Sequence, residues 1–342
     1  MHRVLVVGAG SIGERHVRCL CQTGRAEVSI SEPHDERRRE VAGRYSLESA
    51  YSDLESVLEV RHDAAVIATP AQLHISIATR LAAAGCHLLI EKPLSTTLDG
   101  IDDLSAIARQ RRLVIAVAYV YRAHAALQAM RQAIGAARFG TPVQIVAHSG
   151  QHFPTYRPAY REIYYADHAS GGGAIQDALT HLLNAGEFLV GPLDRVMADA
   201  AHRVLEGVTV EDTVHLLARH GTVLGSYSLN QYQAPNETSI TVVCQSGTAR
   251  FDLQAANWRW MTEPGGAWHE EPACCRDRDA LFTAQANAFL DAIEGRAAPL
   301  CSLREGLQTL RANLAVLAAS RSGAWTRILH GDATSTELGP DR

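Results

Sequence analysis

Gly8-Ala-Gly10-Ser11-Ile12-Gly13 stands directly after the apolar run Arg3–Val7 and opens the helical pattern of residues 12–22. In such a turn the first glycine permits a tight bend, and the second lets the backbone approach a pyrophosphate. The third lets the helix pack closely on the strand, with the phosphates at the positive helix N-terminus. The turn, Ser11 and Ile12 included, therefore predicts a dinucleotide-binding site.

A carboxylate, Glu32, follows the second expected strand, Glu27–Ile30, about 20 residues after the turn. It can accept hydrogen bonds from a ribose diol and would repel a 2′-phosphate, so NAD is predicted and NADP is the less favoured alternative. Arg37, Arg38 and Arg39 come next, and one of them could reach a phosphate. We interpret them instead as a solvated helix face.

Short β-rich runs continue to alternate with helical patterns through the first third of the chain. Further strands are expected at Ala64–Ala68, His87–Ile90 and Val114–Ala118, and further helices at 35–44, 72–84 and 98–110. Nearly all-apolar strands separated by helices are typical of parallel sheets that are covered on both faces. An α/β fold is predicted, with residues 1–120 forming a Rossmann domain built on a doubly wound parallel sheet.

The pattern changes after Tyr121. Alternating runs such as 143–147 and 214–218 read as half-buried strands, with turn residues between neighbouring runs. Helical patterns at 123–135, 174–189, 279–294 and 303–321 would cover one face of their sheet. Residues 121–342 are thus predicted to form an α+β domain with a largely antiparallel open sheet, which binds substrate and mediates oligomerisation.

A homo-oligomer, a dimer or a tetramer, is expected from the same domain. In the strand at residues 222–229, apolar side chains occur at both odd and even positions, so they point to both faces of the sheet. A face that is fully exposed to solvent would not favour them. The uncovered face should therefore meet another subunit.

Composition excludes several classes of protein. The 342 residues are 46% hydrophobic and 20% charged, as in folded globular chains, and the net charge of −5 lacks the basic footprint of a nucleic-acid binder. The longest central apolar run, 114–121, is far shorter than the roughly 20 residues of a membrane helix. The N-terminus does not read as a signal peptide, and the seven scattered cysteines read as reduced thiols rather than disulfides or a metal site. A cytoplasmic protein without a metal is expected.

Two short motifs lie at the ends of expected strands. Thr69-Pro70 follows 64–68, and Glu91-Lys92-Pro93 follows 87–90. Ligands of open α/β sheets bind at the carboxyl ends of the strands, so these motifs are expected to line the cofactor cleft. The alternative is a surface lysine that pairs with Glu91.

Gly171-Gly-Gly173 precedes a helical pattern that contains Asp177 and His181. Their four-residue separation places both side chains on one helix face, where they could address the same cleft. The alternative is an ordinary hydrogen-bonded pair within a helix.

GAGSIG, Glu91-Lys92-Pro93 and the GGG turn followed by Asp177 and His181 together resemble the glucose–fructose oxidoreductase, inositol dehydrogenase and rhizopine-catabolism (Gfo/Idh/MocA) family. The resemblance runs from Met1 to about Gly323. It implies a two-domain enzyme that transfers hydride between a nicotinamide and a sugar, cyclitol or related alcohol. It also implies that Lys92, Asp177 and His181 line the active site.

These three residue types suit the oxidation of a secondary alcohol. His181, with an ordinary pKa near 6.5, is the expected general base. Lys92 would donate to the developing alkoxide and stabilise its charge, and Asp177 would orient the substrate or the histidine.

The segment 151–168 is dense in aromatic rings and arginines, which suit sugar rings and anionic groups. We predict that it selects the substrate, or alternatively that it is an ordered surface loop or a subunit contact. Its expected substrate-binding residues, together with Arg122 just after the last Rossmann strand, are Arg122, Tyr156, Arg157, Arg161 and Tyr164.

The favoured hypothesis is an NAD(P)-dependent oxidoreductase that acts on a secondary alcohol or ketone of a sugar, nucleotide-sugar or cyclitol. One alternative is a dinucleotide-binding regulator without turnover. Another is an NAD-dependent lyase or glycosidase that oxidises its substrate transiently.

Overall fold

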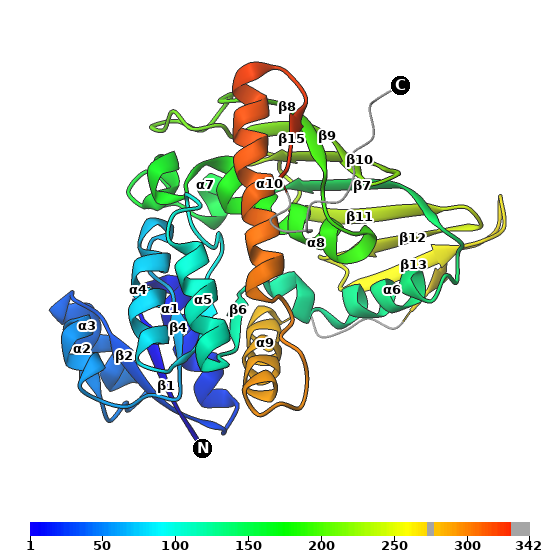
Figure 1. The fold of residues 1–342 in the computed structure, drawn as a ribbon. Coiled ribbons are helices and arrows are strands. Elements are labelled where there is room, and N and C mark those ends of the chain that lie inside the picture. Colours follow the sequence, from blue (N-terminus) through cyan, green and yellow to red (C-terminus); the bar gives the residue numbers. More distant parts are fainter. Residues whose placement is uncertain (272–276, 330–342) are drawn as a thin grey trace.

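The computed structural model describes residues 1–271 and 277–329. The chain begins with a six-stranded parallel sheet, in which the strands have the order β3-β2-β1-β4-β5-β6 (Figure 1). This is the doubly wound sheet predicted from the sequence. Its elements are β1 (His2–Val7), α1 (Ser11–Gln22), β2 (Ala26–Ser31), α2 (Asp35–Arg44), β3 (Ala50–Tyr51), α3 (Leu54–Leu58), β4 (Ala64–Ile67), α4 (His74–Ala83), β5 (His87–Ile90), α5 (Ile101–Arg111) and β6 (Ile115–Val117).

A nine-stranded sheet follows, ordered β14-β13-β12-β11-β7-β10-β9-β8-β15. Its pairs are antiparallel except β10 with β7, so the predicted largely antiparallel sheet is confirmed. The strands are β7 (Pro142–Gly150), β8 (Arg195–Ala201), β9 (Thr213–His220), β10 (Val223–Asn230), β11 (Glu237–Cys244), β12 (Gly247–Asp252), β13 (Asn257–Met261), β14 (His269–Glu270) and β15 (Thr326–Arg327).

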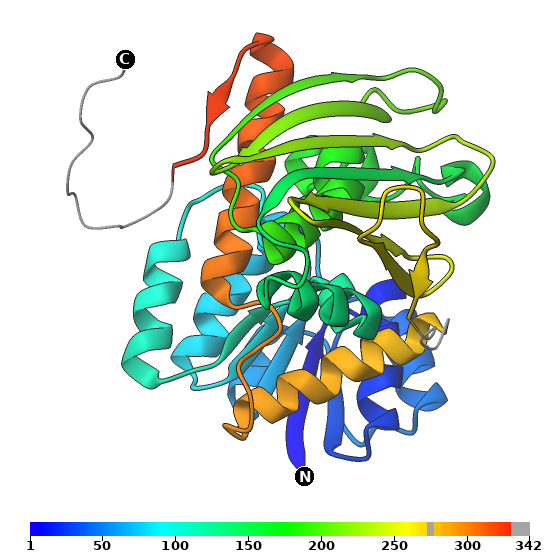
Figure 2. The ribbon, with the colours of Figure 1, turned by 90° about the vertical axis from the view of Figure 1, so that its right-hand side faces the viewer.

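Among the described residues, helices cover one face of this second sheet and leave the other face without a helix (Figure 2). They include α6 (Ala125–Gly135), α8 (Thr180–Val190) and the distal half of α10 (Leu303–Ser322). Buried side chains of the strands, such as Leu216 and Ile240, share a core with Leu183 and Val316 of these helices. The alternation of buried and exposed residues along β9 and β10 follows from this one-sided cover.

One late helix, α9 (Arg278–Ile293), packs on the first sheet. Phe289 and Leu290 share a core with Val4 and Val6 of β1. The sequence predicted that this helix would cover the second sheet, and that prediction is wrong because α9 packs on the first sheet. The periodicity of a helix indicates which of its faces is apolar, but it does not indicate which sheet that face contacts.

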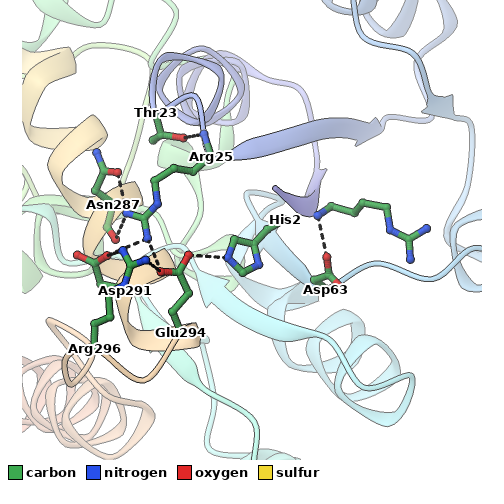
Figure 3. A network of polar contacts seen from close by, with 9 residues as sticks. His2, Thr23, Arg25, Asp63, Asn287, Asp291, Glu294 and Arg296 are labelled. Carbon is green, nitrogen blue, oxygen red and sulfur yellow. Dashed lines mark hydrogen bonds and ion pairs between the residues drawn. The ribbon is translucent and has the colours of Figure 1, made fainter.

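Polar contacts at its far end hold α9 in place (Figure 3). Arg25 donates from Nη2 to Asp291 at 2.8 Å and to Glu294 at 3.0 Å, and from Nη1 to the Asn287 side chain at 3.0 Å. His2 contacts Glu294 as well, with 2.8 Å between Nε2 and Oε1. The N-terminal strand and the start of β2 are thereby tied to a segment more than 250 residues away.

The long helix α10 joins the two sheets (Figure 1). It begins with a capping box, in which the Ser302 side chain accepts the Glu305 N–H and Glu305 accepts the Ser302 N–H. Leu310 lies in the core of the first sheet, and Val316 lies in the core of the second. The helices of the second sheet are therefore fixed relative to the strand ends of the first sheet.

Within the described ranges, none of the helices has the length and apolarity that a bilayer crossing requires. No group of three His, Cys, Asp or Glu side chains in these ranges is placed to hold a metal ion. The five cysteines of the same ranges are free thiols: Cys19, Cys21, Cys86, Cys244 and Cys301.

Candidate active site

The glycine turn between β1 and α1 is built as its sequence requires. Gly8 has φ of +88°, and a β-carbon there would lie 2.8 Å from the Ala68 carbonyl oxygen. A β-carbon on Gly13 would lie 1.8 Å from the Gly8 carbonyl oxygen, whereas one on Gly10 would meet no atom within 4 Å. The first and third glycines are thus required by the fold. The second leaves the backbone open beside the N-terminus of α1, at Ser11 and Ile12.

Glu32 lies directly beside this turn. The carboxylate is buried, and it accepts the Ala9 N–H at 2.9 Å and the His34 N–H at 3.0 Å. Arg37 approaches to 3.8 Å from Glu32 Oε1, while Arg38 and Arg39 both pair with Asp35 on their own helix. A negative charge is therefore held next to the glycine turn by the end of β2.

The Thr69-Pro70 turn closes the same edge of the sheet. Thr69 Oγ1 is buried and has no hydrogen-bond partner in the described part of the chain. The buried His74 ring joins this turn to the next one, because its Nε2 lies 2.8 Å from the Thr69 carbonyl and its Nδ1 lies 3.1 Å from the Pro93 carbonyl. The open Gly10 backbone, the helix N-terminus and the unpartnered hydroxyl fit a dinucleotide at this edge.

Lys92 reaches across to the helical segment after the GGG turn. Its Nζ donates to both the Asp177 carboxylate and the Asp177 carbonyl, each at 2.9 Å. Tyr164 donates its hydroxyl to the same carboxylate oxygen at 2.7 Å. Burial favours the neutral acid, but the charges of Lys92 and Arg157 and these hydrogen bonds lower the pKa of Asp177 well below its usual range. The carboxylate is thus ionised.

Glu91 connects this centre to the glycine-turn helix. One of its oxygens lies 2.7 Å from Nε2 of the buried His16 on α1, and the other accepts the Lys92 N–H at 3.0 Å. The alternative that we considered, a surface pair between the Lys92 and Glu91 side chains, is not formed, because Lys92 Nζ contacts Asp177. One Glu91 oxygen holds the Lys92 backbone and the other contacts His16, a residue of this network that the sequence did not single out.

His181 lies against two tyrosines of the segment that leaves the Rossmann sheet. Its ring stacks on Tyr121 at 4.9 Å between centroids and meets Tyr119 edge-on at 6.1 Å. The ring is partly exposed, but Nδ1 is buried and has no hydrogen-bond partner among the described residues. Burial and the nearby Lys92 charge lower the pKa of His181 to about 3. The ring is therefore neutral, and one of its nitrogens keeps a lone pair that can accept a hydrogen bond.

Asp177 and His181 do not form the hydrogen-bonded pair that their spacing allowed. Asp177 lies in a π-helical turn, Ile175–Leu179, which runs directly into α8. A π-helical turn has more residues per turn than an α-helix, so Asp177 and His181 do not lie directly above one another on one helix face. Asp177 instead pairs with Lys92, and its charge still acts on the pKa of His181.

We expect the His181 ring to remain neutral in the pH range where an ordinary histidine, with a pKa of about 6.5, takes up a proton. NMR titration of the ring, with the signal assigned through His181→Gln, measures this directly. Below pH 6.5 the unfolded chain binds a proton that the folded ring refuses until about pH 3, so this group makes stability fall as the pH falls through 6.5. A His181 signal that titrates near 6.5 would contradict the assignment.

Arg122 is not placed in this site. It is buried between α8 and α10, where Nε donates to the Asn184 side chain at 2.8 Å and Nη1 donates to Glu305 at 2.5 Å and to the Leu300 carbonyl at 3.0 Å. The structure thus does not bring Arg122 to the Lys92–Asp177 centre, because its donors join α8 to α10 and to the segment before α10.

The segment 151–168 divides in two. Tyr164 contacts Asp177, and Arg157 is partly buried with its charge acting on the pKa of the same carboxylate. Arg161 instead donates from Nε to the Glu206 carbonyl at 2.8 Å on the surface, and the Tyr156 ring is 51% exposed. The structure thus brings Arg157 and Tyr164 to the site. It places the Arg161 guanidinium and the Tyr156 ring on the surface, against the expectation.

Family models match both halves of this arrangement. An oxidoreductase family model with an NAD-binding Rossmann fold matches residues 2–119, and the C-terminal domain model of the same GFO/IDH/MocA family matches residues 127–250. The chain belongs to the Gfo/Idh/MocA oxidoreductase family. The resemblance drawn from the three motifs is confirmed, and the first domain is an NAD-binding Rossmann domain.

Two curated relatives match nearly the whole chain, and a third matches less than half of it. UDP-N-acetylglucosamine 3-dehydrogenase of Acidithiobacillus ferrooxidans is 27% identical over 325 residues, which are 93% of this chain and 96% of the relative. The 1,5-anhydro-D-fructose reductase of Ensifer adhaerens is 24% identical over 360 residues, covering 97% of this chain and 100% of the relative. Inositol 2-dehydrogenase 1 of Saccharopolyspora erythraea is 34% identical over 149 residues, covering 42% and 44% respectively.

Solved structures share the fold. Levoglucosan dehydrogenase in complex with NADH superposes with a TM-score of 0.87 at 20% identity, covering 96% of this chain and 99% of the other. The WlbA dehydrogenase from Bordetella pertussis, in complex with NADH and UDP-GlcNAcA, superposes with a TM-score of 0.81 at 25% identity and the same coverage. Each of these two dehydrogenases therefore matches the present chain over almost its full length.

Proposed function

We propose that this family member is an NAD-dependent dehydrogenase or reductase that transfers hydride between the nicotinamide and a secondary alcohol or ketone of a sugar, nucleotide-sugar or cyclitol. The observation that carries the proposal is the contact of Lys92 Nζ with Asp177 at the carboxyl edge of the Rossmann sheet. A neutral His181 lies beside this charged pair. The names of the relatives, which include sugar, nucleotide-sugar and inositol dehydrogenases, support the same class of substrate.

Lys92 is suited to hold the oxygen of the reacting carbon. An ammonium has three N–H donors, and two of them are used by the Asp177 carboxylate and carbonyl. The third remains for a substrate oxygen, where the positive charge would stabilise a developing alkoxide. Asp177 and Glu91 act on the lysine itself, one by fixing its ammonium and the other by fixing its backbone.

His181 is suited to hold the hydroxyl proton. Its neutral ring accepts a proton as the C–H bond breaks and returns one when the reaction runs as a reduction. Tyr121 and Tyr119 orient the ring by stacking and edge contact. Bound NAD supplies the hydride acceptor or donor, and the residues of the glycine turn, Glu32 and Thr69 would hold it at the strand ends.

The two alternatives differ from this proposal in what they do to the cofactor. A regulator would bind NAD without changing it, and it would not need a charged lysine beside a neutral histidine. A lyase or glycosidase with transient oxidation would release product while the redox state of NAD stays unchanged. Incubation with a panel of sugars, cyclitols and nucleotide-sugars, followed by NADH absorbance and product analysis, separates the three.

NAD is expected to bind more tightly than NADP because Glu32 would repel a 2′-phosphate. Titration of the wild-type protein with both cofactors measures the preference. Glu32→Gln should shrink the preference by about tenfold to a hundredfold, since one charged interaction is worth about 1.5–3 kcal/mol. Arg39→Ala, which removes a guanidinium paired with Asp35 on the exposed helix face, is the matched control and should keep the preference. Tighter NADP binding by the wild type would overturn the assignment and bring Arg37 into the cofactor site.

We also propose that the uncovered face of the second sheet pairs with a second copy of the chain. Met197, Leu217 and Val146 are 37%, 54% and 40% exposed. They lie in one row across β8, β9, β10 and β7, because Leu217 pairs with Met197 and with Ser226, which in turn pairs with Val146. An exposed apolar row on a sheet fits burial in a homo-oligomer.

Light scattering tests this proposal. We expect a mass of at least twice the 37.0 kDa of the chain, and Leu217→Lys should lower it because a charge would be buried in the interface. A mass near 37.0 kDa for the wild type at micromolar concentration would contradict the proposal.

The cytoplasmic location remains a prediction from the sequence. It rests on the scattered cysteines, which read as reduced thiols. The free thiols among the described residues support it.

A further inference from the structure

Glu211 lies beside the GGG turn, at the start of the helical segment that carries Asp177. Its buried carboxylate accepts the Ile175 N–H at 2.9 Å, and its own backbone carbonyl accepts the Ala174 N–H at 2.9 Å. Ile175 is the first residue of the π-helical turn that contains Asp177. One residue from a distant part of the sequence therefore holds two consecutive N–H groups where this segment begins.

The GGG turn fits closely against this side chain. Gly173 has φ of +84°, and a β-carbon there would lie 2.6 Å from Glu211 Oε1. On the other side of the turn, a β-carbon on Gly171 would lie 3.0 Å from the Ala71 β-carbon of the first domain. The turn is thus packed between Glu211 and the first domain.

The Glu211 side chain is itself held in place. Its second oxygen lies 2.5 Å from Nε2 of His168, and the hydrogen bond to Glu211 raises the pKa of His168. The His168 carbonyl in turn accepts a hydrogen bond from the Gln176 side chain at 2.9 Å. The next residue, Asp212, is fully buried and accepts the backbone N–H groups of residues 203–205. A side chain that is fixed in this way can set the position of the segment to which it is hydrogen-bonded.

The position of the π-helical turn matters to the Lys92–Asp177 contact. Lys92 Nζ donates to the Asp177 carbonyl as well as to its carboxylate, each at 2.9 Å. The carbonyl belongs to the backbone of the turn, so a shift of the turn would move an acceptor of Lys92 directly. His181 follows the turn in α8, and the charges of Lys92 and Asp177 act on the pKa of its ring.

We propose that Glu211 is a positioning residue of the hydride-transfer centre, which acts through the N–H groups at the start of the π-helical turn to place Asp177 and, with it, the Lys92 ammonium. This inference rests on the proposed function and adds to its site a residue that acts through the backbone. The turn needs the reach of the Glu211 side chain more than its charge, because Oε1 must meet the Ile175 N–H. Side-chain length at position 211 is therefore expected to decide activity.

Three variants of Glu211 test this expectation. Glu211→Ala removes the acceptor, Glu211→Asp withdraws it by one methylene, and Glu211→Gln keeps an acceptor at the same reach. The first two should lower kcat about tenfold to a hundredfold with NAD affinity unchanged, since a small misplacement of reacting groups has effects of this size. Glu211→Gln should keep most of the wild-type kcat.

A matched control is available in the first domain. Asp53 caps α3 by accepting the Ser56 N–H at 2.8 Å, so Asp53→Ala removes a carboxylate cap of the same kind away from the site. Its kcat should equal that of the wild type. If Glu211→Ala does not fold, the comparison of Glu211→Asp with Glu211→Gln tests the same proposal.

Two further readouts separate positioning from a general loss of structure. If Glu211 acts through Lys92, Glu211→Ala should add little to the loss of kcat that Lys92→Ala already causes, whereas independent damage to the fold would multiply the two losses. The NMR signal of the His181 ring requires no turnover. It should shift in Glu211→Ala and Glu211→Asp and keep its wild-type position in Glu211→Gln and Asp53→Ala.

Wild-type kcat in Glu211→Ala, or an equal loss of kcat in Glu211→Gln and Glu211→Asp, would overturn the proposal. So would losses that multiply in the double variant, or a His181 signal that does not move in Glu211→Ala. If the wild type oxidises no sugar, the proposed function fails, and the His181 signal alone decides whether Glu211 places the turn.

Discussion

Lys92→Ala is expected to lower kcat about 10²–10⁴-fold while leaving NAD affinity close to that of the wild type, because the lysine would act on charge that develops at the substrate oxygen. His181→Ala should lower kcat by the same order through loss of the proton acceptor. Since the two groups act on one hydroxyl, the double variant should lose less than the product of the single effects. Steady-state kinetics and NAD titration of the three variants measure this.

A matched control comes from the surface. Arg80 pairs with Glu55 at 2.8 Å on exposed parts of the first domain, so Arg80→Ala should leave kcat unchanged. Lys92→Ala also leaves the buried Asp177 without its cation, so its melting temperature is measured alongside. Near-normal kcat in either Lys92→Ala or His181→Ala would remove that residue from the mechanism. Near-normal kcat in both would point to a different active site.

Gly13→Ala is expected to lower NAD affinity by about 100-fold or more and to lower the melting temperature. A β-carbon at this position would lie 1.8 Å from the Gly8 carbonyl, so the turn cannot keep its shape. Each backbone hydrogen bond to a phosphate that is lost costs about 1.5–3 kcal/mol. Fluorescence titration with NAD and thermal unfolding of the cofactor-free protein give the two readouts.

Gly10→Ala separates cofactor binding from folding. Its β-carbon meets no protein atom within 4 Å, so the cofactor-free protein should melt as the wild type does. NAD affinity should still fall by about tenfold or more, because the side chain stands where the backbone is open to the pyrophosphate. Wild-type NAD affinity in Gly10→Ala would mean that the cofactor does not approach this turn.

Secondary structure followed closely from periodicity. The predicted strand at His87–Ile90 and the predicted helix at 35–44 have the observed bounds, because a short apolar run that alternates with polar helical segments is a local signal. The strand β3 and the helix α3 were missed, since two and five residues are too short for either signal. The packing of α9 on the first sheet was missed for another reason. The apolar face of a helix can be predicted from its periodicity, but the sheet that this face contacts cannot.

Residues of the candidate site could be predicted where they belong to a short sequence motif. Lys92 and Asp177 were each placed by a short motif, and the structure brings them together across 85 residues of sequence. Arg122 and Arg161 were misplaced, because their partners Glu305 and Glu206 lie far along the chain and no local spacing indicates them. His16 is a single titratable residue on a helix, and such a residue gives no signal until the fold shows that it faces Glu91.

The most direct test of the central claim is NADH formation by the wild-type protein and by Lys92→Ala, measured side by side with NAD and a panel of sugars, sugar acids, cyclitols and nucleotide-sugars. Deuterium at the reacting carbon of the active substrate should appear in the NADH that the wild type forms, and Lys92→Ala should form it about 10²–10⁴-fold more slowly. A protein that binds NAD but transfers no deuterium from any member of the panel would contradict the assignment of Lys92, Asp177 and His181 as a hydride-transfer centre.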